Sequence, residues 1–372
     1  MKKIFKLGEF FSGPGGIGYG ALLASNSMKR TGFSIEHSWA SDYDKDSCET
    51  YSHNISNKNI YCTPVQDFFK LVDNKKIILP KFNSFAYGFP CNDFSNVGEH
   101  KGFKGKFGPL YSYGVELMNR YKPDWFLAEN VSGMSSANEG NSFKTILSEL
   151  KNSGEGYNLT VHKYKFEEYG IPQARHRIII VGFKKKIGKD FYFKVPKPSY
   201  KIVTCKDVIS KPIKKGDPNH IFTNNSKIVI ERLKLIKPGE SAFTANLPSR
   251  LQIKAKGAKI SQIYKRLDPN KPSYTVTGSG GGGTHVYHWK EPRALTNRER
   301  ARLQTFPDSF VFKGSKESQR KQIGMAVPVD GAKIIFESIL KCFAKIKYDW
   351  IEPNIDIEKN IAVSNQLELK IS

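Results

Sequence analysis

The chain has 372 residues and a formal net charge of +24, because 59 lysines and arginines outnumber 35 aspartates and glutamates. A folded protein this basic is expected to meet a polyanion such as a nucleic acid, although a ribosome-associated or membrane-surface protein has a similar charge balance. Five scattered cysteines without a Cys-x-x-Cys pair argue against a disulfide framework and a structural zinc site, and the lack of a long apolar run or signal core argues against a membrane protein.

The amino-terminal segment has the pattern of a strand followed by a glycine turn. Residues 4–11 predict a first strand, and Gly13-Pro14-Gly15-Gly16-Ile17-Gly18 follows before a helix expected over about 19–24. This order is typical of a nucleotide-binding α/β fold, because glycines let the backbone approach a ligand at a helix amino terminus. A purely structural tight turn fits the glycine spacing equally well.

A second strand is predicted over residues 34–40 and ends near Asp42-Tyr43. Asp42 lies 24 residues after Gly18, about where an acid bonds a ribose hydroxyl, and Tyr43 offers a ring for stacking on adenine. A solvated acidic turn is the alternative. The glycine turn upstream favours the cofactor interpretation.

The central feature is a cysteine that follows a buried strand. Residues 82–89 predict the strand, and the chain breaks at Gly88 and Pro90, which places Cys91 on a turn past the carboxyl end of the strand. Catalytic groups of α/β enzymes gather at such ends, and an exposed thiol there can act as a nucleophile. A small buried hydrophobic residue is the alternative reading of Cys91.

Two further segments extend this pattern. Residues 96–108 are rich in glycine and lysine, which predicts either a loop that closes over a phosphate backbone or an ordinary surface loop. After a helix predicted over 110–121, residues 123–131 predict another buried strand that carries Glu129 near its end. A buried acid is costly without a partner or a function, so we expect Glu129 and Cys91 to converge on one crevice.

Arginines and prolines mark the second half of the chain. Arg175 and Arg177 alternate just before a strand predicted over 178–183, so they are expected to point the same way, while a basic strand edge is the alternative. From about residue 184, prolines and lysines predict a second, irregular and mostly β domain. It closes with a glycine run over 278–283, which is either a flexible linker or backbone packed against nucleic acid, with Thr275 and Thr277 as phosphate donors.

Regular structure is predicted again near the carboxyl terminus. Thr296-x-x-Glu299 is a capping-box pattern that opens a helix through Leu303, and further helices are expected over 317–323 and 331–346. The polar tail carries no recognisable motif.

Together these segments resemble the cytosine carbon-5 DNA methyltransferase family, in which the same motifs occur in the same order. The resemblance covers residues 4 to about 345. The matching segments are Phe11-Ser12-Gly13-Pro14-Gly15-Gly16, Gly88-Phe89-Pro90-Cys91-Asn92-Asp93-Phe94-Ser95, Glu129-Asn130-Val131, Gln173-Ala174-Arg175-His176-Arg177, Arg293-Ala294-Leu295-Thr296-Asn297-Arg298-Glu299 with Arg302-Leu303-Gln304-Thr305-Phe306-Pro307, and Gln322-Ile323-Gly324-Met325-Ala326-Val327-Pro328.

The resemblance implies a covalent mechanism. Cys91 would add to carbon 6 of cytosine, which makes carbon 5 nucleophilic, and a protonated Glu129 would donate to nitrogen 3. Arg177, with Arg175 near it, would hold the carbonyl oxygen and orient the acid. The base must leave the duplex for this chemistry.

The resemblance also implies S-adenosylmethionine as the methyl donor and no metal. The implied cofactor residues are Phe11, Gly13, Gly15 and Gly16 at the amino-acid end, Asp42 at the ribose, Tyr43 at the adenine, Pro90 and Leu110 on the methyl-transfer side, and Met325 and Ala326. The implied DNA contacts are Ser95 and Gln173, which join Thr275 and Thr277.

Three positions depart from the family pattern. Asn92 stands where glutamine usually follows Pro-Cys, so the loop contact after base flipping is expected to differ. Pro64 replaces an acid that contacts the adenine amino group, so that contact passes to Asp67 or is absent. Met325 replaces an asparagine that makes a polar contact to the cofactor or across the domain joint.

The predicted protein is therefore an α/β enzyme with the mainly parallel, Rossmann-like sheet of S-adenosylmethionine-dependent methyltransferases and a smaller, mostly β or irregular target-recognition domain. Its predicted parts are a catalytic and cofactor-binding domain (1–190 with 311–348), a target-recognition domain and hinge (191–310) and a tail (349–372). We expect a cytoplasmic, nucleoid-associated monomer of prokaryotic or phage origin that methylates duplex DNA and is paired with a restriction endonuclease. An RNA methyltransferase of the same fold, a catalytically silent DNA-binding regulator and a nicotinamide-dependent dehydrogenase are the alternatives.

Overall fold

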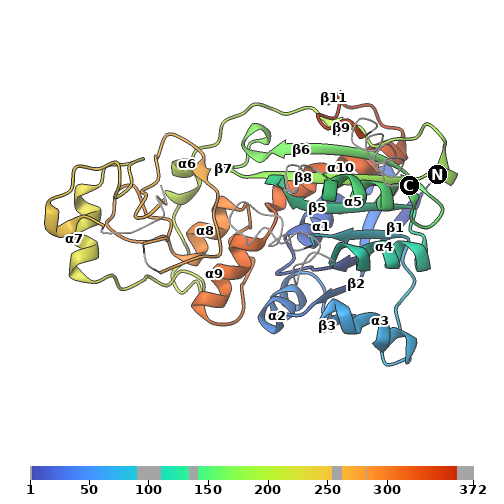
Figure 1. Ribbon diagram of the computed structural model, residues 1–372, viewed down its shortest axis with the longest axis horizontal. Helices are drawn as coiled ribbons and strands as arrows, with labels where there is room; N and C mark the ends of the chain where they lie inside the picture. Colours follow the sequence, from blue (N-terminus) through green and yellow to red (C-terminus); the bar gives the residue numbers. More distant parts are fainter. Residues whose placement is uncertain (1, 90–109, 134–140, 254–261, 282, 358–372) are drawn as a thin grey trace, which may run out of the picture. The chain divides into compact units, whose positions relative to one another are not determined.

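The computed structural model describes residues 2–89, 110–133, 141–253, 262–281 and 283–357 (Figure 1). These residues form two compact units. The first unit comprises residues 1–165, 176–197 and 332–372, and the second comprises residues 166–175 and 198–331. The division differs from the predicted domains, because 166–175 and 311–331 group with the second unit; the function of each domain stays a prediction.

A seven-stranded sheet forms the centre of the first unit, with strand order β3-β2-β1-β4-β5-β8-β6. All neighbouring strands pair in parallel except β8, which runs antiparallel to both β5 and β6. The predicted mainly parallel sheet is therefore confirmed. The strands are β1 (Lys3–Phe10), β2 (Phe33–Asp42), β3 (Ile60–Cys62), β4 (Ser84–Tyr87), β5 (Trp125–Val131), β6 (Tyr157–Lys165) and β8 (His176–Lys184).

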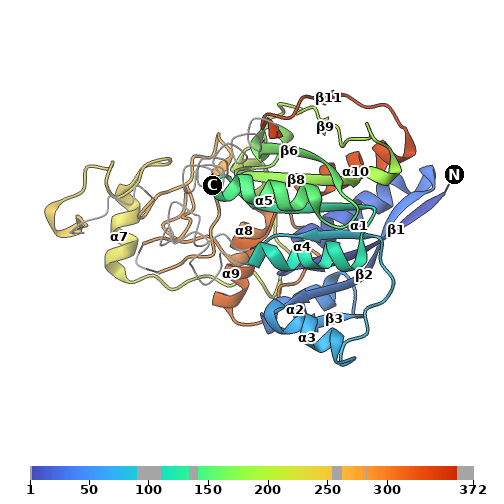
Figure 2. The same cartoon turned by 45° about the vertical axis from the view of Figure 1, so that its right-hand side comes forward.

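Helices cover both faces of this sheet, as Figure 2 shows for α4 and α5 on one face and α1 and α10 on the other. The alternation of side chains along each strand divides the aromatic residues between the faces. Phe126 joins the core beneath α3, α4 and α5, whereas the preceding Trp125 meets Phe336 of α10 at 5.9 Å between ring centroids. The helices are α1 (Gly16–Met28), α2 (Lys45–Asn54), α3 (Val65–Asp73), α4 (Leu110–Tyr121), α5 (Asn141–Asn152) and α10 (Val329–Ala344).

The second unit is mostly irregular backbone. Its strands β7 (Gln173–Ala174) and β10 (Ser273–Tyr274) have two residues each, and its helices are α6 (Cys205–Ile209), α7 (Lys227–Leu235), α8 (Asn297–Leu303) and α9 (Lys316–Met325). Buried arginines replace a sheet in satisfying the backbone carbonyls: Arg266 donates from Nη1 to the oxygens of Leu233 and Ile236, both at 2.9 Å. The predicted capping box of Thr296 and Glu299 at α8 is confirmed.

Two short strands, β9 (Val195–Pro196) and β11 (Trp350–Ile351), pair near the end of the first unit. The helix predicted over residues 110–121 coincides with α4, and the other predicted elements differ from the observed ones by one to a few residues at their ends. Elements such as α2, α3 and β3 had no predicted counterpart. Among the described residues, no helix combines the length and the apolar character that a membrane crossing requires.

A close contact between β5 and β8 gives a test of the packing. Gly182 faces Phe126 across the two strands, and a Cβ added to Gly182 would lie 2.1 Å from the Phe126 ring. We therefore expect Gly182→Ala to lower the free energy of unfolding by about 1–3 kcal/mol in urea titrations. In a Phe126→Leu background the ring is gone, so the same substitution should cost less than about 1 kcal/mol. An equal cost in both backgrounds would contradict this packing.

Candidate functional site

The glycine turn after β1 has a backbone that requires glycine. Gly15 caps the amino terminus of α1 with a φ of 99°, and a Cβ added there would lie 2.2 Å from the side chain of Ile55. Gly13 has a φ of 52°, and a Cβ added there would meet nothing within 4 Å. The predicted cofactor residues Phe11, Gly13, Gly15 and Gly16 therefore form a fixed turn with open space beside Gly13, at the start of a thirteen-residue helix.

Asp42 holds this turn against the end of β2. Its Oδ2 accepts a hydrogen bond from the backbone N–H of Gly13 at 2.8 Å, and its Oδ1 accepts one from Asp44 at 2.9 Å. Burial raises the pKa of Asp42 above its usual value. Each carboxylate oxygen accepts two hydrogen bonds, so the predicted ribose contact is compatible with these two. Tyr43, the predicted adenine contact, follows at once and is 58% exposed.

Glu9 is a buried acid in this region that the sequence analysis missed. It lies on β1, where its Oε2 accepts a hydrogen bond from the hydroxyl of Tyr51 at 3.0 Å. Its Oε1 is buried and has no hydrogen-bond partner in the described part of the chain. Burial raises the pKa of Glu9 to about 8. An acid near the end of an apolar strand, the signal that singled out Glu129, would also have identified Glu9.

Glu129 and Arg177 form an ion pair at the carboxyl end of β5, where β8 begins. The distance between Glu129 Oε1 and Arg177 Nε is 2.8 Å, and the side chains are 12% and 14% exposed. The register of the antiparallel strands explains the contact: Arg177 of β8 lies opposite Val131, two residues beyond Glu129 on the same face of β5. The sequence analysis predicted both residues for one site, and the structure brings them together.

The chain that leads to Cys91 is anchored beside this pair. The side chain of Asn130 donates from Nδ2 to the backbone oxygen of Phe89 at 3.1 Å, and both residues are buried. A Cβ added to Gly88 would lie 3.1 Å from Glu129 Oε2. Pro90, Cys91, Asn92 and Ser95 lie outside the residues that the structure describes, and Leu110, where the description resumes, is buried in the core.

Three predicted residues of the second unit form hydrogen bonds with its backbone. Gln173 is fully buried; its Oε1 accepts from the N–H of Val276 at 2.8 Å, and its Nε2 donates to Leu303 and Gln304. Thr275 donates to the oxygen of Ala174 at 2.7 Å. Arg175 is buried and donates from Nη1 to the oxygens of Val276 and Gly324, so its partners differ from those of Arg177.

Of the remaining predicted residues, Thr277 and Met325 are exposed, and the backbone oxygen of Ala326 accepts a hydrogen bond. Thr277 lies 2.6 Å from the hydroxyl of Ser279 and is exposed. Met325 ends α9 with 59% of its surface exposed, whereas Ala326 is buried and its oxygen accepts from Gln304. Within the described ranges, no group of three or more His, Cys, Asp or Glu side chains could hold a metal ion.

Comparisons with known proteins agree on one family. Residues 5–341 match the family of C-5 cytosine-specific DNA methylases. The chain is 52% identical to the Type II methyltransferase M.BbvI of Brevibacillus brevis, over 95% of this chain and 96% of that one. It is 35% identical to the Type II methyltransferase M.NgoFVII of Neisseria gonorrhoeae, over 91% and 87% of the two chains. The fold resembles that of the Entamoeba histolytica methyltransferase EhMeth, with a TM-score of 0.62, 16% identity and coverage of 93% and 100%.

The buried acid Glu9 should make stability depend on pH. Its pKa in the folded protein, about 8, lies above the usual 4.5, so the folded protein keeps a proton that the unfolded chain releases between these values. The stabilisation is therefore complete below about pH 4.5 and is lost as the pH rises toward 8. Glutamine has no proton to release, so Glu9→Gln should not lose stability in this way. The free energy of unfolding of Glu9→Gln minus that of wild type should therefore increase by up to ~1.4 kcal/mol per pH unit between pH 4.5 and 8. Parallel stability–pH curves in urea titrations would contradict this.

Proposed function

Because the chain belongs to the C-5 cytosine-specific DNA methylase family and is thus an enzyme that methylates cytosine in DNA, we propose that Cys91, Glu129 and Arg177 perform the chemistry. The observation that supports this most directly is the Glu129–Arg177 ion pair beside the anchored end of β4. Family membership gives no support to the RNA methyltransferase, silent regulator or dehydrogenase alternatives.

Chain geometry limits how far Cys91 can lie from the pair. Cys91 follows Phe89 by two residues, and two residues span at most about 7 Å. Phe89 is itself held by Asn130, the residue after Glu129. Cys91 is therefore expected within reach of the same substrate ring as Glu129.

The proposed reaction begins when the thiolate of Cys91 bonds to carbon 6 of a cytosine that has left the duplex. The electron pair of the 5,6 double bond then becomes available at carbon 5, and the charge that develops at nitrogen 3 is met by Glu129, whose ion-paired carboxylate takes up a proton from solvent as the base enters and donates it to nitrogen 3. Arg177 presents fixed guanidinium donors to the carbonyl oxygen and holds Glu129 in position. After methylation, loss of the carbon 5 proton and departure of Cys91 restore the aromatic ring.

The family implies S-adenosylmethionine, which supplies the methyl group. The residues of the first unit fit such a donor: Gly13 leaves open space at the glycine turn, Asp42 presents a half-buried carboxylate, and Tyr43 presents an exposed ring. We propose that Phe11, Gly13, Gly15 and Gly16 line its amino-acid end and that Asp42 and Tyr43 bind its ribose and adenine. Pro90, Leu110, Met325 and Ala326 remain further proposed contacts.

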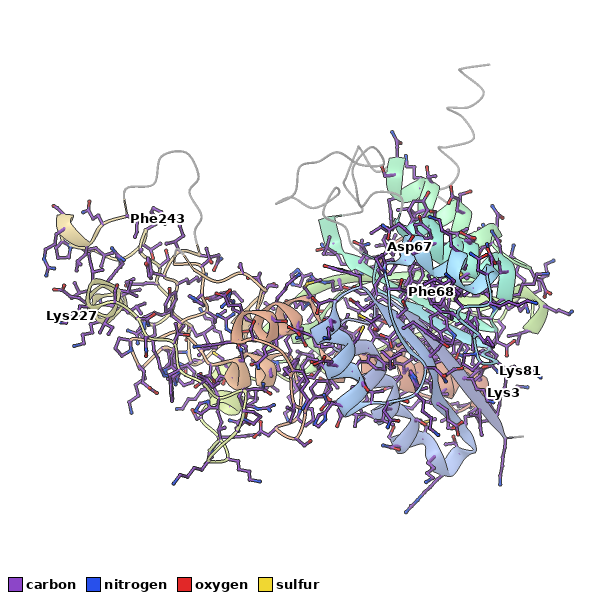
Figure 3. The ribbon with its side chains drawn as sticks, turned by 90° about the horizontal axis from the view of Figure 1, so that it is seen from below. Lys3, Asp67, Phe68, Lys81, Lys227 and Phe243 are labelled. Atoms are coloured by element: carbon purple, nitrogen blue, oxygen red, sulfur yellow. The ribbon has the colours of Figure 1, made fainter. Side chains whose placement is uncertain are left out.

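The second unit is proposed to hold the duplex. It carries 26 lysines and arginines against 12 acidic residues, an excess suited to a phosphate backbone. Lys227 and Phe243 lie on its surface (Figure 3), and Phe243 is 41% exposed. Exposed cations and rings of this kind contact phosphates and bases in DNA complexes. Ser95 and Thr277 are proposed to add contacts, whereas Gln173 and Thr275 are proposed to position the backbone.

The relatives named Type II methyltransferases suggest the biological setting. We propose that the protein works as a monomer in the cytoplasm and protects host DNA from a cognate restriction endonuclease. Sequencing of methylated cytosines in DNA from a host that expresses the chain would identify the site, and resistance of that DNA to the endonuclease would test the pairing.

The nucleophile can be tested by trapping. Wild type with methyl donor should become covalently attached to duplex DNA that carries 5-fluorocytosine at the target position, because fluorine cannot leave as the carbon 5 proton does. Cys91→Ser should form no adduct and lose methyl transfer by at least about 10³-fold. Cys62→Ser, which changes a different cysteine that is exposed, is the matched control and should retain the adduct. An adduct that forms without Cys91 would refute the mechanism.

The two arginines should respond differently to substitution by lysine. Arg177→Lys keeps the charge but loses the fixed donors, so kcat should fall by about 10²-fold while the melting temperature changes little. Arg175→Lys loses bonds to the carbonyls of Val276 and Gly324, so its melting temperature should fall. Equal effects of both variants on kcat and melting temperature would contradict the separate roles.

A further inference from the structure

The glycine run of the second unit has a fixed path along α9. A Cβ added to Gly324 of α9 would lie 2.0 Å from the backbone nitrogen of Gly278, and one added to Gly278 would lie 3.0 Å from the Cα of Lys321. Backbone therefore packs directly on backbone here. Gly281 then turns with a φ of 101°, a conformation that favours glycine. These contacts hold residues 278–281 against α9, so this part of the run is not a flexible linker.

Three cations gather at this loop. Arg320 of α9 packs against Gly280, where an added Cβ would lie 2.4 Å from its guanidinium, and its Nε lies 3.4 Å from the oxygen of Gly278. Burial, followed by the charges of Arg320 and Arg300, lowers the pKa of Lys316. Burial and the same three cations lower the pKa of His285 to about 4. The groups therefore repel one another, and His285 is neutral near pH 7.

Arg300 of α8 is the most deeply buried of these cations and lacks adequate partners. Its surface is 1% exposed, and Nη1 has no hydrogen-bond partner within the described residues. Its Nη2 lies 3.2 Å from Nδ1 of His285, but Nε2 of the same ring lies 3.2 Å from the N–H of Gly281. A neutral imidazole has one acceptor nitrogen, so only one of these two donors can be satisfied.

Nearby carboxylates do not neutralise the cluster. Glu299, next to Arg300, already receives two hydrogen bonds of 2.8 Å from Arg293. The ion pair of Arg320 with Glu317 is long, at 3.9 Å, and the Glu317 side chain is 85% exposed. Burial lowers the pKa of Arg300 to about 10, so its guanidinium stays charged near neutral pH. A buried charge without a counter-ion is destabilising, so an anion at this point would be strongly favoured.

We infer that Arg300 and Arg320, together with the glycine loop over residues 278–281, form a site for one phosphodiester group of the DNA backbone. Guanidinium groups match phosphate oxygens as paired donors, and glycine backbone allows a close approach. The exposed hydroxyls of Thr277 and Ser279, which lie 2.6 Å apart on the same loop, add two possible donors. This inference rests on DNA as the substrate and gives Arg300 a role that none of the sequence motifs assigns.

The test compares three charge-removing variants in binding to a duplex without target cytosine. Arg300→Met and Arg320→Gln should each weaken binding about five- to tenfold, and the slope of log K against log salt should fall by about 0.9. Arg250→Gln removes a charge from the same unit, but Arg250 is exposed and paired with Glu231, so it is the matched control and should change affinity less than about twofold. Unchanged affinity and slope in Arg300→Met and Arg320→Gln would overturn the inference.

Thermal unfolding separates a ligand site from a structural role of Arg300. If the guanidinium of Arg300 is an anion-binding group, Arg300→Met should melt at the wild-type temperature or higher. Inorganic phosphate should then raise the melting temperature of wild type more than that of the variant. A lower melting temperature with unchanged DNA affinity would mean that Arg300 is structural. If Arg300→Met does not fold, Arg320→Gln, whose side chain is 13% exposed, still decides the question by its salt slope.

Methyl transfer to a mixed-sequence duplex is measured separately with the same proteins. Active wild type with unchanged salt slopes in Arg300→Met and Arg320→Gln would reject the phosphate site and leave the proposed catalysis intact. Reduced slopes with inactive wild type would support the phosphate site and reject the proposed catalysis.

Discussion

The reversed direction of a single strand, β8, is the constraint on which the proposed active site depends. In the otherwise parallel sheet, β5 ends where β8 begins, so Glu129 near the end of β5 and Arg177 near the start of β8 meet at the carboxyl ends of the parallel strands. If β8 ran parallel, its first residues would lie at the amino ends of these strands. The ion pair therefore follows from topology, and the neighbouring β4 delivers the chain to the same edge through the bond from Asn130 to Phe89.

Two acids, Asp42 and Glu9, lie near the glycine turn that is proposed to bind the cofactor. Asp42 fastens the glycine turn to β2 through Oδ2 and accepts a hydrogen bond from Asp44 through Oδ1, while Glu9 on β1 accepts one from Tyr51 through Oε2. Burial raises the pKa of both acids. Such groups reduce stability in the absence of compensation, which is common where a fold has been shaped to bind a polar ligand.

Arginine has two roles in the second unit. Because little regular structure is present in its described residues, carbonyl groups need other donors, and Arg266 and Arg175 supply them from buried guanidinium groups. Arg300 is as deeply buried but lacks comparable acceptors. All three guanidinium nitrogens of Arg266 donate to carbonyl groups, and the contrast with Arg300 is the reason for proposing that Arg300 faces a ligand.

The sequence by itself determined the order of the motifs and the mainly parallel sheet, because periodicity and glycine turns are local properties of the chain. The family resemblance placed Glu129 and Arg177 in one site, and the reversed β8 explains how they meet there. Only the tertiary structure decided the partners: that Arg175 and Gln173 brace the backbone, that Glu9 is buried, and that the glycine run packs on α9. Arg175 and Arg177 are two positions apart and look alike in the sequence. Their different environments are set by segments about 50 to 150 residues away, which no local pattern records.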